Sequence, residues 1–188
     1  MRCRTYNSHE PRRLYRGGGF SLLELSAVMV IVGIIAGTAV VSMTSMTGNL
    51  SAMAAAQLHR DMTFARQRAV ATGTRSWVQF DTVAQTWTVR VDDTGTPGWA
   101  ASLVLTDPAT GGTFVQPVNT GRFLGVTMTA VNFDGTDWIG FDWLGRSLKK
   151  DGPPPTRPLA ATGTVTFSGG EQITVEKDTG HIVFVPAP

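Results

Sequence analysis

Hydrophobic residues in the first 72 positions follow two successive patterns. No ionisable side chain occurs from Leu25 to Val41, and counted from Phe20 the apolar run is long enough to cross a bilayer. Further on, apolar residues recur at helical spacing, with most charged residues, Asp61 among them, off the stripe. The stripe consists of Leu50, Ala54, Leu58, Met62, Ala65 and Ala69. With no proline between 20 and 71, the pattern predicts one helix of about 50 residues, roughly 75–80 Å long.

After this helix the chain changes to short alternating runs rich in β-branched and aromatic residues. Residues 76–81 and 86–91 are predicted to form a hairpin in which Val78 and Phe80 face Val89 and Val91. Further strands are expected at 102–105, 113–116, 126–133, 138–143, 165–168, 173–177 and 181–185, the last two joined at 178–180.

Strands and helices do not alternate, which excludes a parallel βαβ architecture. The tract 151–158 carries four prolines and cannot be an interior strand. Trp138 and Trp143 are expected in the core rather than in an exposed patch. The sequence therefore predicts an α+β fold in which one long N-terminal helix packs on antiparallel β-sheet.

The residues that flank the apolar run add charges to this picture. Arg12, Arg13 and Arg16 precede it, and such a cluster holds a segment on the cytoplasmic face of a membrane. Glu24 lies in its first turn, where a carboxylate in hydrocarbon costs roughly 2.5–3.5 kcal/mol or more. A secretory signal peptide, cut near residues 36–39, is the alternative, but its apolar region would not carry Glu24 and its basic leader would be unusually long.

Gly19-Phe20-Ser21-Leu22-Leu23-Glu24-Leu25 resembles the processing site of type IV prepilins and type II secretion pseudopilins. The resemblance implies that a prepilin peptidase cuts after Gly19 and methylates the new amine of Phe20. It further implies that Glu24 pairs with the N-terminal amine of a neighbouring subunit during filament assembly. The physics agrees, because a buried cation in lipid needs an opposite charge.

Three later stretches are similar to the GspH/FimT family of minor pseudopilins and pilins, to which FimU belongs. They are residues 58–73, the Phe-Asp-x-x-Gly-Arg segment at 141–146, and the final strand at 180–185. The motif residues are expected to be structural, and they are Phe141, Asp142, Gly145 and Arg146. Arg146 is expected to pair with Asp142 and pin the loop, with a contact to a neighbouring subunit as the alternative.

Composition and spacing exclude several classes of chemistry. The formal charge of +2 comes from the leader, because removal of residues 1–19 takes away five arginines and one glutamate and leaves 11 basic and 13 acidic residues. Cys3 is the only cysteine, and the three histidines are scattered. Asp92-Asp93-Thr94-Gly95 is interpreted as a solvated turn rather than a calcium loop. No phosphate loop or nucleophile elbow is present, so we expect no enzyme activity, metal or cofactor.

The predicted organisation has four parts. Residues 1–19 are a cleaved basic leader, 20–47 the transmembrane and assembly half of the helix, 48–72 its amphipathic half, and 73–188 a periplasmic β-rich domain. The protein is expected to cross the inner membrane once with a cytoplasmic N-terminus. Its expected partners are prepilin peptidase, other pilin or pseudopilin subunits and the inner membrane itself.

The expected function is that of a minor pseudopilin, a structural subunit of the type II secretion pseudopilus. The alternative is a FimT/FimU-like minor type IV pilin, involved in pilus assembly or, with less support, in DNA uptake. DNA-binding members carry Gly-Arg-x-Arg near the C-terminus, whereas residues 180–183 contain no arginine. No lysine or arginine follows Lys177, so the clustered cations that bind phosphate are missing and DNA is not an expected partner.

Overall fold

In a computed structural model of the protein, residues 21–92, 99–150 and 157–188 are described, without the side chains of residues 37–47. The predicted leader, the cleavage site at Gly19–Phe20, most of the turn at 92–95 and most of the proline tract lie outside these ranges. The chain divides into two compact units, Met1–Val41 and Ser42–Pro188.

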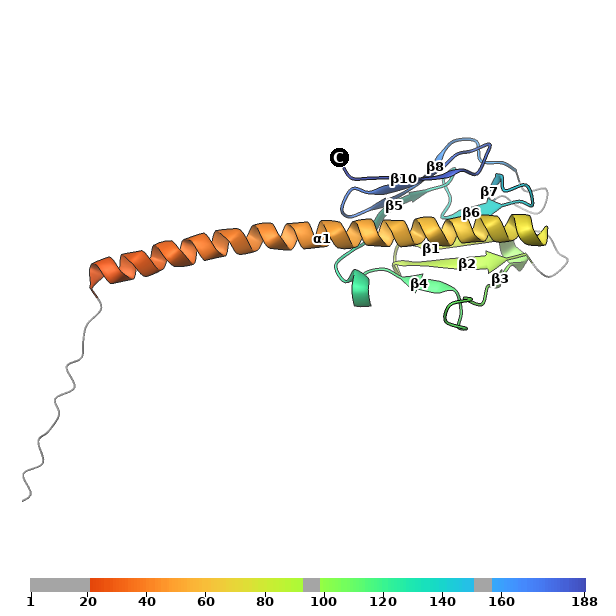
Figure 1. Ribbon diagram of the computed structural model, residues 1–188. Helices are drawn as coiled ribbons and strands as arrows, with labels where there is room; N and C mark the ends of the chain where they lie inside the picture. The colour runs from red at the N-terminus through yellow and green to blue at the C-terminus, as the bar shows by residue number, and fades with distance from the viewer. Residues whose placement is uncertain (1–20, 93–98, 151–156) are drawn as a thin grey trace, which may run out of the picture. The chain divides into compact units, whose positions relative to one another are not determined.

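Helix α1 (Leu22–Thr72) is 51 residues long and passes from the first unit into the second (Figure 1). Ser21 precedes it as the N-cap, and its hydroxyl oxygen accepts a hydrogen bond from the Glu24 amide at 3.2 Å. The helix ends before Gly73, whose φ of +69° is the left-handed conformation that glycine adopts after a helix. Within the described residues no helical stretch is both long and apolar enough to cross a membrane, so the predicted crossing is not confirmed.

The second unit contains two antiparallel sheets (Figure 1). The first has the order β3-β2-β1-β6-β7, and β4 also pairs with β2. Its strands are β1 (Ser76–Asp81), β2 (Thr86–Val91), β3 (Leu103–Val104), β4 (Val115–Pro117), β6 (Trp138–Phe141) and β7 (Ser147–Lys149). The second has the order β10-β9-β8-β5, with β5 (Met128–Asn132), β8 (Gly163–Phe167), β9 (Gln172–Val175) and β10 (Ile182–Val185). The described parts of the connections include the short 3₁₀ helices η1 (Trp99–Ala101) and η2 (Gly121–Phe123).

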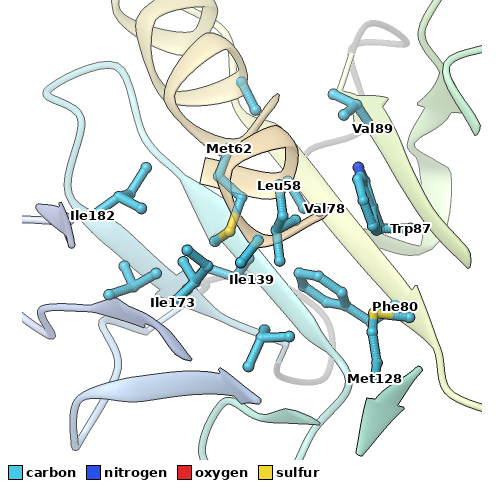
Figure 2. Close-up of a cluster of buried hydrophobic side chains, with 14 of the residues drawn as sticks. Leu58, Met62, Val78, Phe80, Trp87, Val89, Met128, Ile139, Ile173 and Ile182 are labelled. Atoms are coloured by element: carbon cyan, nitrogen blue, oxygen red, sulfur yellow. The ribbon is translucent and has the colours of Figure 1, made fainter. Parts of the chain in front are cut away.

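One core joins the second half of α1 to both sheets. Leu58 and Met62 of the helix are fully buried and point among Val78, Ile139 and Ile173, as Figure 2 shows. The other members of the predicted helical stripe follow the same rule: Ala54, Ala65 and Ala69 are buried, and Leu50 packs against the core from its margin. The periodicity of the stripe therefore identified the buried face.

The predicted α+β fold is confirmed, with three differences. Strands form two sheets, because β1 pairs with β6 while β8 pairs with β5. In the first hairpin Val78 lies opposite Val89 as expected, but Phe80 lies opposite Trp87, since a four-residue turn fixes the register. Strand β7 was not expected. It is three residues long and exists through its pairing with β6.

Candidate assembly site

Glu24 stands in the first turn of α1 with an exposed side chain. Its amide donates to Ser21 Oγ, and the Ser-x-x-Glu spacing is that of a capping box. A carboxylate here is also favoured by the positive end of the helix dipole. The hydrogen bond uses the main chain of Glu24, so the local effect of its side chain is that of a negative charge in the first turn, which the sequence analysis did not consider. Its exposed carboxylate remains accessible to a second group.

The apolar side chains that follow Glu24 are exposed around the whole helix rather than on one face. Five consecutive residues from Val28 to Val32 are all at least half exposed, which no single buried face explains. The exposed set after Glu24 is Leu25, Val28, Met29, Val30, Ile31, Val32, Ile34 and Ile35, and Leu22 and Leu23 before it are exposed as well. A helix that is apolar on every side is normally covered by other helices or by lipid.

The Phe-Asp-x-x-Gly-Arg segment forms the turn between β6 and β7. Asp142 is buried, and one carboxylate oxygen accepts the amides of Leu144 and Arg146 at 2.9 and 2.8 Å. The other oxygen accepts Nε and Nη2 of Arg146 at 2.8 and 2.7 Å. This is the pairing that the sequence predicted for Arg146. Four donors on one carboxylate hold the turn in a single conformation.

The same turn is fastened to α1 and to the end of the chain. Gly145 has a φ of +77°, and its carbonyl accepts Arg66 Nε at 2.8 Å. Arg66 Nη2 also donates to the carbonyl of Thr179, between β9 and β10, at 3.2 Å. Gly180 lies so close that a Cβ there would stand 2.2 Å from the Gly145 oxygen. The segments that resemble one family in sequence thus meet in space.

Phe141, the remaining residue of the motif, is fully buried at the end of β6. Beyond it the prediction for the tryptophans is half wrong. Trp138 is buried with 6% exposure, whereas Trp143 is 48% exposed and lies under the guanidinium of Arg75, 6.0 Å from the ring centre. The strand ends at Phe141, so Trp143 belongs to the turn and not to the alternating pattern. Leu144 beside it is also exposed.

Asp61 was expected off the helical stripe and is in fact buried. One carboxylate oxygen accepts Trp87 Nε1 at 2.9 Å, and the other accepts Gln57 Nε2 at 2.8 Å. Burial away from water raises the pKa of Asp61, and the two hydrogen bonds oppose that shift. Asp61 follows Leu58 by three positions and precedes Ala65 by four, so helical spacing places it on the stripe. The sequence analysis placed Asp61 off the stripe because the residue is charged.

No cluster of metal-ligating side chains occurs in the described parts of the chain. The described residues instead comprise a globular unit with a packed core and a helical segment with exposed apolar side chains. The exposed apolar side chains are available for contact with other helices or with lipid.

Comparison with known proteins finds solved structures with a similar fold. No family model matches the sequence, and no curated protein matches it. Two solved structures of the minor pseudopilin EpsH, from the type 2 secretion system of Vibrio cholerae, match with TM-scores of 0.52 and 0.53 at 10% identity. They cover 74% of this chain and 96% and 97% of theirs. The type IV minor pilin FimU of Pseudomonas aeruginosa gives a TM-score of 0.42 at 14% identity, over 71% of this chain and 91% of its own.

The likeness to EpsH concerns the fold. At this identity it confirms the fold that the sequence resemblance implied, one N-terminal helix packed on antiparallel sheets.

Proposed function

We propose that this protein is a minor pseudopilin, a structural subunit that enters the pseudopilus of a type II secretion system through its N-terminal helix. The observation that carries the proposal is the EpsH-like fold over nearly the whole length of that protein. The order of basic leader, Gly19, Phe20, Glu24 and apolar run supports it independently.

In this function the two parts of α1 have different tasks. The apolar residues after Glu24 are covered by lipid before assembly and by neighbouring helices in the filament. Glu24 neutralises the methylated amine of a neighbour's Phe20, which would otherwise be an unpaired cation in a low-dielectric site. The globular unit stays outside the inner membrane and needs no disulfide, because its core and the Asp142 turn hold it together.

Processing by prepilin peptidase is tested by the mature N-terminus. We expect N-terminal sequencing and mass spectrometry of the membrane-extracted protein to find methylated Phe20 as the first residue. A chain that begins near Ala39 or Val40 would identify a secretory signal peptide and contradict the proposal.

The machine itself is tested by deleting the gene in its host. Loss of secreted enzymes from the medium, with surface pili and twitching unchanged, is the expected result for a pseudopilin. Loss of pili with normal secretion would favour the FimT/FimU-like minor pilin.

A further inference from the structure

Two arginines of the globular unit converge on a single neutral acceptor. Arg60 Nη2 donates to Gln57 Oε1 at 2.7 Å, and Arg122 Nη2 donates to the same oxygen at 3.3 Å. Arg60 comes from α1 and Arg122 from η2, so segments 62 positions apart in the sequence bring these cations together. We call Arg60 and Arg122 the arginine pair.

Within the described residues, no carboxylate lies within ion-pair distance of either guanidinium. Asp61, which has an electrostatic interaction with Arg60, already accepts Trp87 and Gln57. Two like charges beside one amide oxygen repel each other. A carboxylate in that position would accept both guanidinium groups through charge-assisted hydrogen bonds, which are roughly twice as strong as neutral ones.

The arginine pair stands where two grooves adjoin. The first groove, which we call the Met53 groove, has a volume of about 360 Å³ and an apolar wall of Met53, Ala56, Phe123 and Phe184. Met53 is 53% exposed, so this wall is open to a partner. The second groove, of about 490 Å³, is lined by Phe64, Phe114, Asp61 and Asp107 among others, and it shares both arginines.

We propose that the arginine pair and the Met53 groove form a docking site for a neighbouring filament subunit, which inserts a carboxylate between the guanidiniums and an adjacent apolar side chain into the groove. This proposal rests on the proposed function, because it takes the neighbour to be another pilin-like subunit. An acidic side chain next to an aliphatic or aromatic one matches both the charge and the apolar wall.

Two other anionic partners fit the surface less well. A nucleic acid is held by cations repeated along its backbone, whereas this site offers two arginines beside His59. A phospholipid would place its phosphate at the arginine pair, next to a second groove that already holds Asp61 and Asp107. A protein segment matches both features of the surface, because its carboxylate binds the arginine pair while its apolar neighbour contacts the wall of the Met53 groove.

The test is site-specific photo-crosslinking of the full-length protein in its native host. A photoreactive amino acid replaces Met53 in one strain and Ile31, in the exposed part of α1, in another. We expect the Met53 position to crosslink to a pilin-like subunit, with an aspartate or glutamate in or next to the crosslinked peptide. In the double variant Arg60→Gln, Arg122→Gln the yield should fall about tenfold, the effect of about 1.4 kcal/mol of lost binding.

The matched control, Lys149→Gln with Lys177→Gln, removes the same charge elsewhere and should leave the yield unchanged. Crosslinking at Ile31 but not at Met53 would overturn the docking site and leave the proposed function intact. A lipid adduct at Met53, or a yield that does not respond to the arginine variants, would also overturn it. Failure at both positions would count against filament assembly itself and therefore against both proposals.

Discussion

The two halves of α1 contain similar apolar residues in opposite environments. Met29, in the first half, is 68% exposed, whereas Met62 in the second half has no exposed surface. The second half concentrates its apolar residues on one stripe, which two sheets can cover. From Val28 to Val32 every residue is apolar, so coverage would be needed on all sides. Hydrophobicity alone therefore does not locate a core. The distribution of apolar residues around the helix determines whether the protein can bury them itself.

The hydrogen bonds of the two halves also differ: those described in the first half are local, whereas some of those in the second half reach distant parts of the chain. In the first half, Ser21 accepts the Glu24 amide and Ser26 donates to the carbonyl of Leu23, both within the local turn. In the second half, Asp61 and Arg66 bind groups far away in the sequence, on β2 and in the β6–β7 turn. The long-range hydrogen bonds of the second half therefore tie the helix to distant parts of the fold, whereas those at Ser21 and Ser26 stabilise only the start of the helix itself.

The largest effect is expected from Glu24→Leu, which makes the first half uniformly apolar. Membrane insertion should be unharmed, because a costly charge is removed. If Glu24 neutralises a neighbour's Phe20 amine, its loss leaves an unpaired cation and costs on the order of 3–5 kcal/mol of assembly. Co-purification with other filament subunits, at normal processing and membrane level, should then fall sharply.

Glu24→Gln separates this role from helix capping. Glutamine keeps a side chain that suits the capping box but has no charge. We expect it to assemble as poorly as the leucine variant. Assembly at the wild-type yield in either variant would show that Glu24 serves only the start of the helix.

Methionine truncation compares the halves directly. Met62→Ala should lower the free energy of unfolding of the globular unit by about 2–5 kcal/mol, because it removes buried contacts and leaves a cavity. Met29→Ala should leave it within about 0.5 kcal/mol, since the side chain is exposed. Urea titration of the full chain in detergent, followed by tryptophan fluorescence, measures both. Equal losses would contradict the division of α1.

A smaller loss is expected from Asp142→Ala, which acts at the turn that Arg66 fastens to the second half. The amides of Leu144 and Arg146 would lose their charged acceptor, at a cost of about 1–3 kcal/mol. Asp178→Ala, at an exposed aspartate in another turn, is the matched control and should change stability by less than about 0.5 kcal/mol. The same urea titration distinguishes the two.

Much of the fold could be predicted because its signals are local. The helical stripe and the first hairpin follow from the spacing of neighbouring residues. The division into two sheets could not be predicted in the same way, since the pairing of Ser76 with Phe141 joins segments 65 positions apart. The three residues of β7 carry too short a pattern to be recognised without their partner strand.

The candidate site shows the same limit at the level of single residues. The Asp142–Arg146 pair was predictable because its members are four residues apart in one turn. The contact of Arg66 with Gly145 and the need for glycine at position 180 depend on three segments meeting, which no local spacing encodes. The arginine pair could not be predicted for the same reason, since Arg122 reaches Gln57 from η2, which is distant in the sequence.

The smallest expected effect concerns Asp61, the charge buried in the second half. Its pKa in the folded protein is raised above the ordinary value of 3.8, chiefly because burial removes water from the carboxylate. The folded state therefore binds the proton more tightly than the unfolded chain does. Stability should fall as the pH rises from about 3.8 through the raised folded pKa, by at most about 1.4 kcal/mol per pH unit, and the penalty is then constant.

Asp61→Asn keeps an oxygen that can accept Trp87 Nε1 and removes the charge. Near pH 3 both side chains are neutral, so the variant and the wild type should be about equally stable there. Above that window the variant should be the more stable protein, because it carries no buried charge. Thermal or urea unfolding of both proteins across the acidic range measures the difference. A difference that does not change with pH would show that the buried carboxylate is fully compensated by Trp87 and Gln57, and that the second half of α1 accommodates a charge as readily as the first.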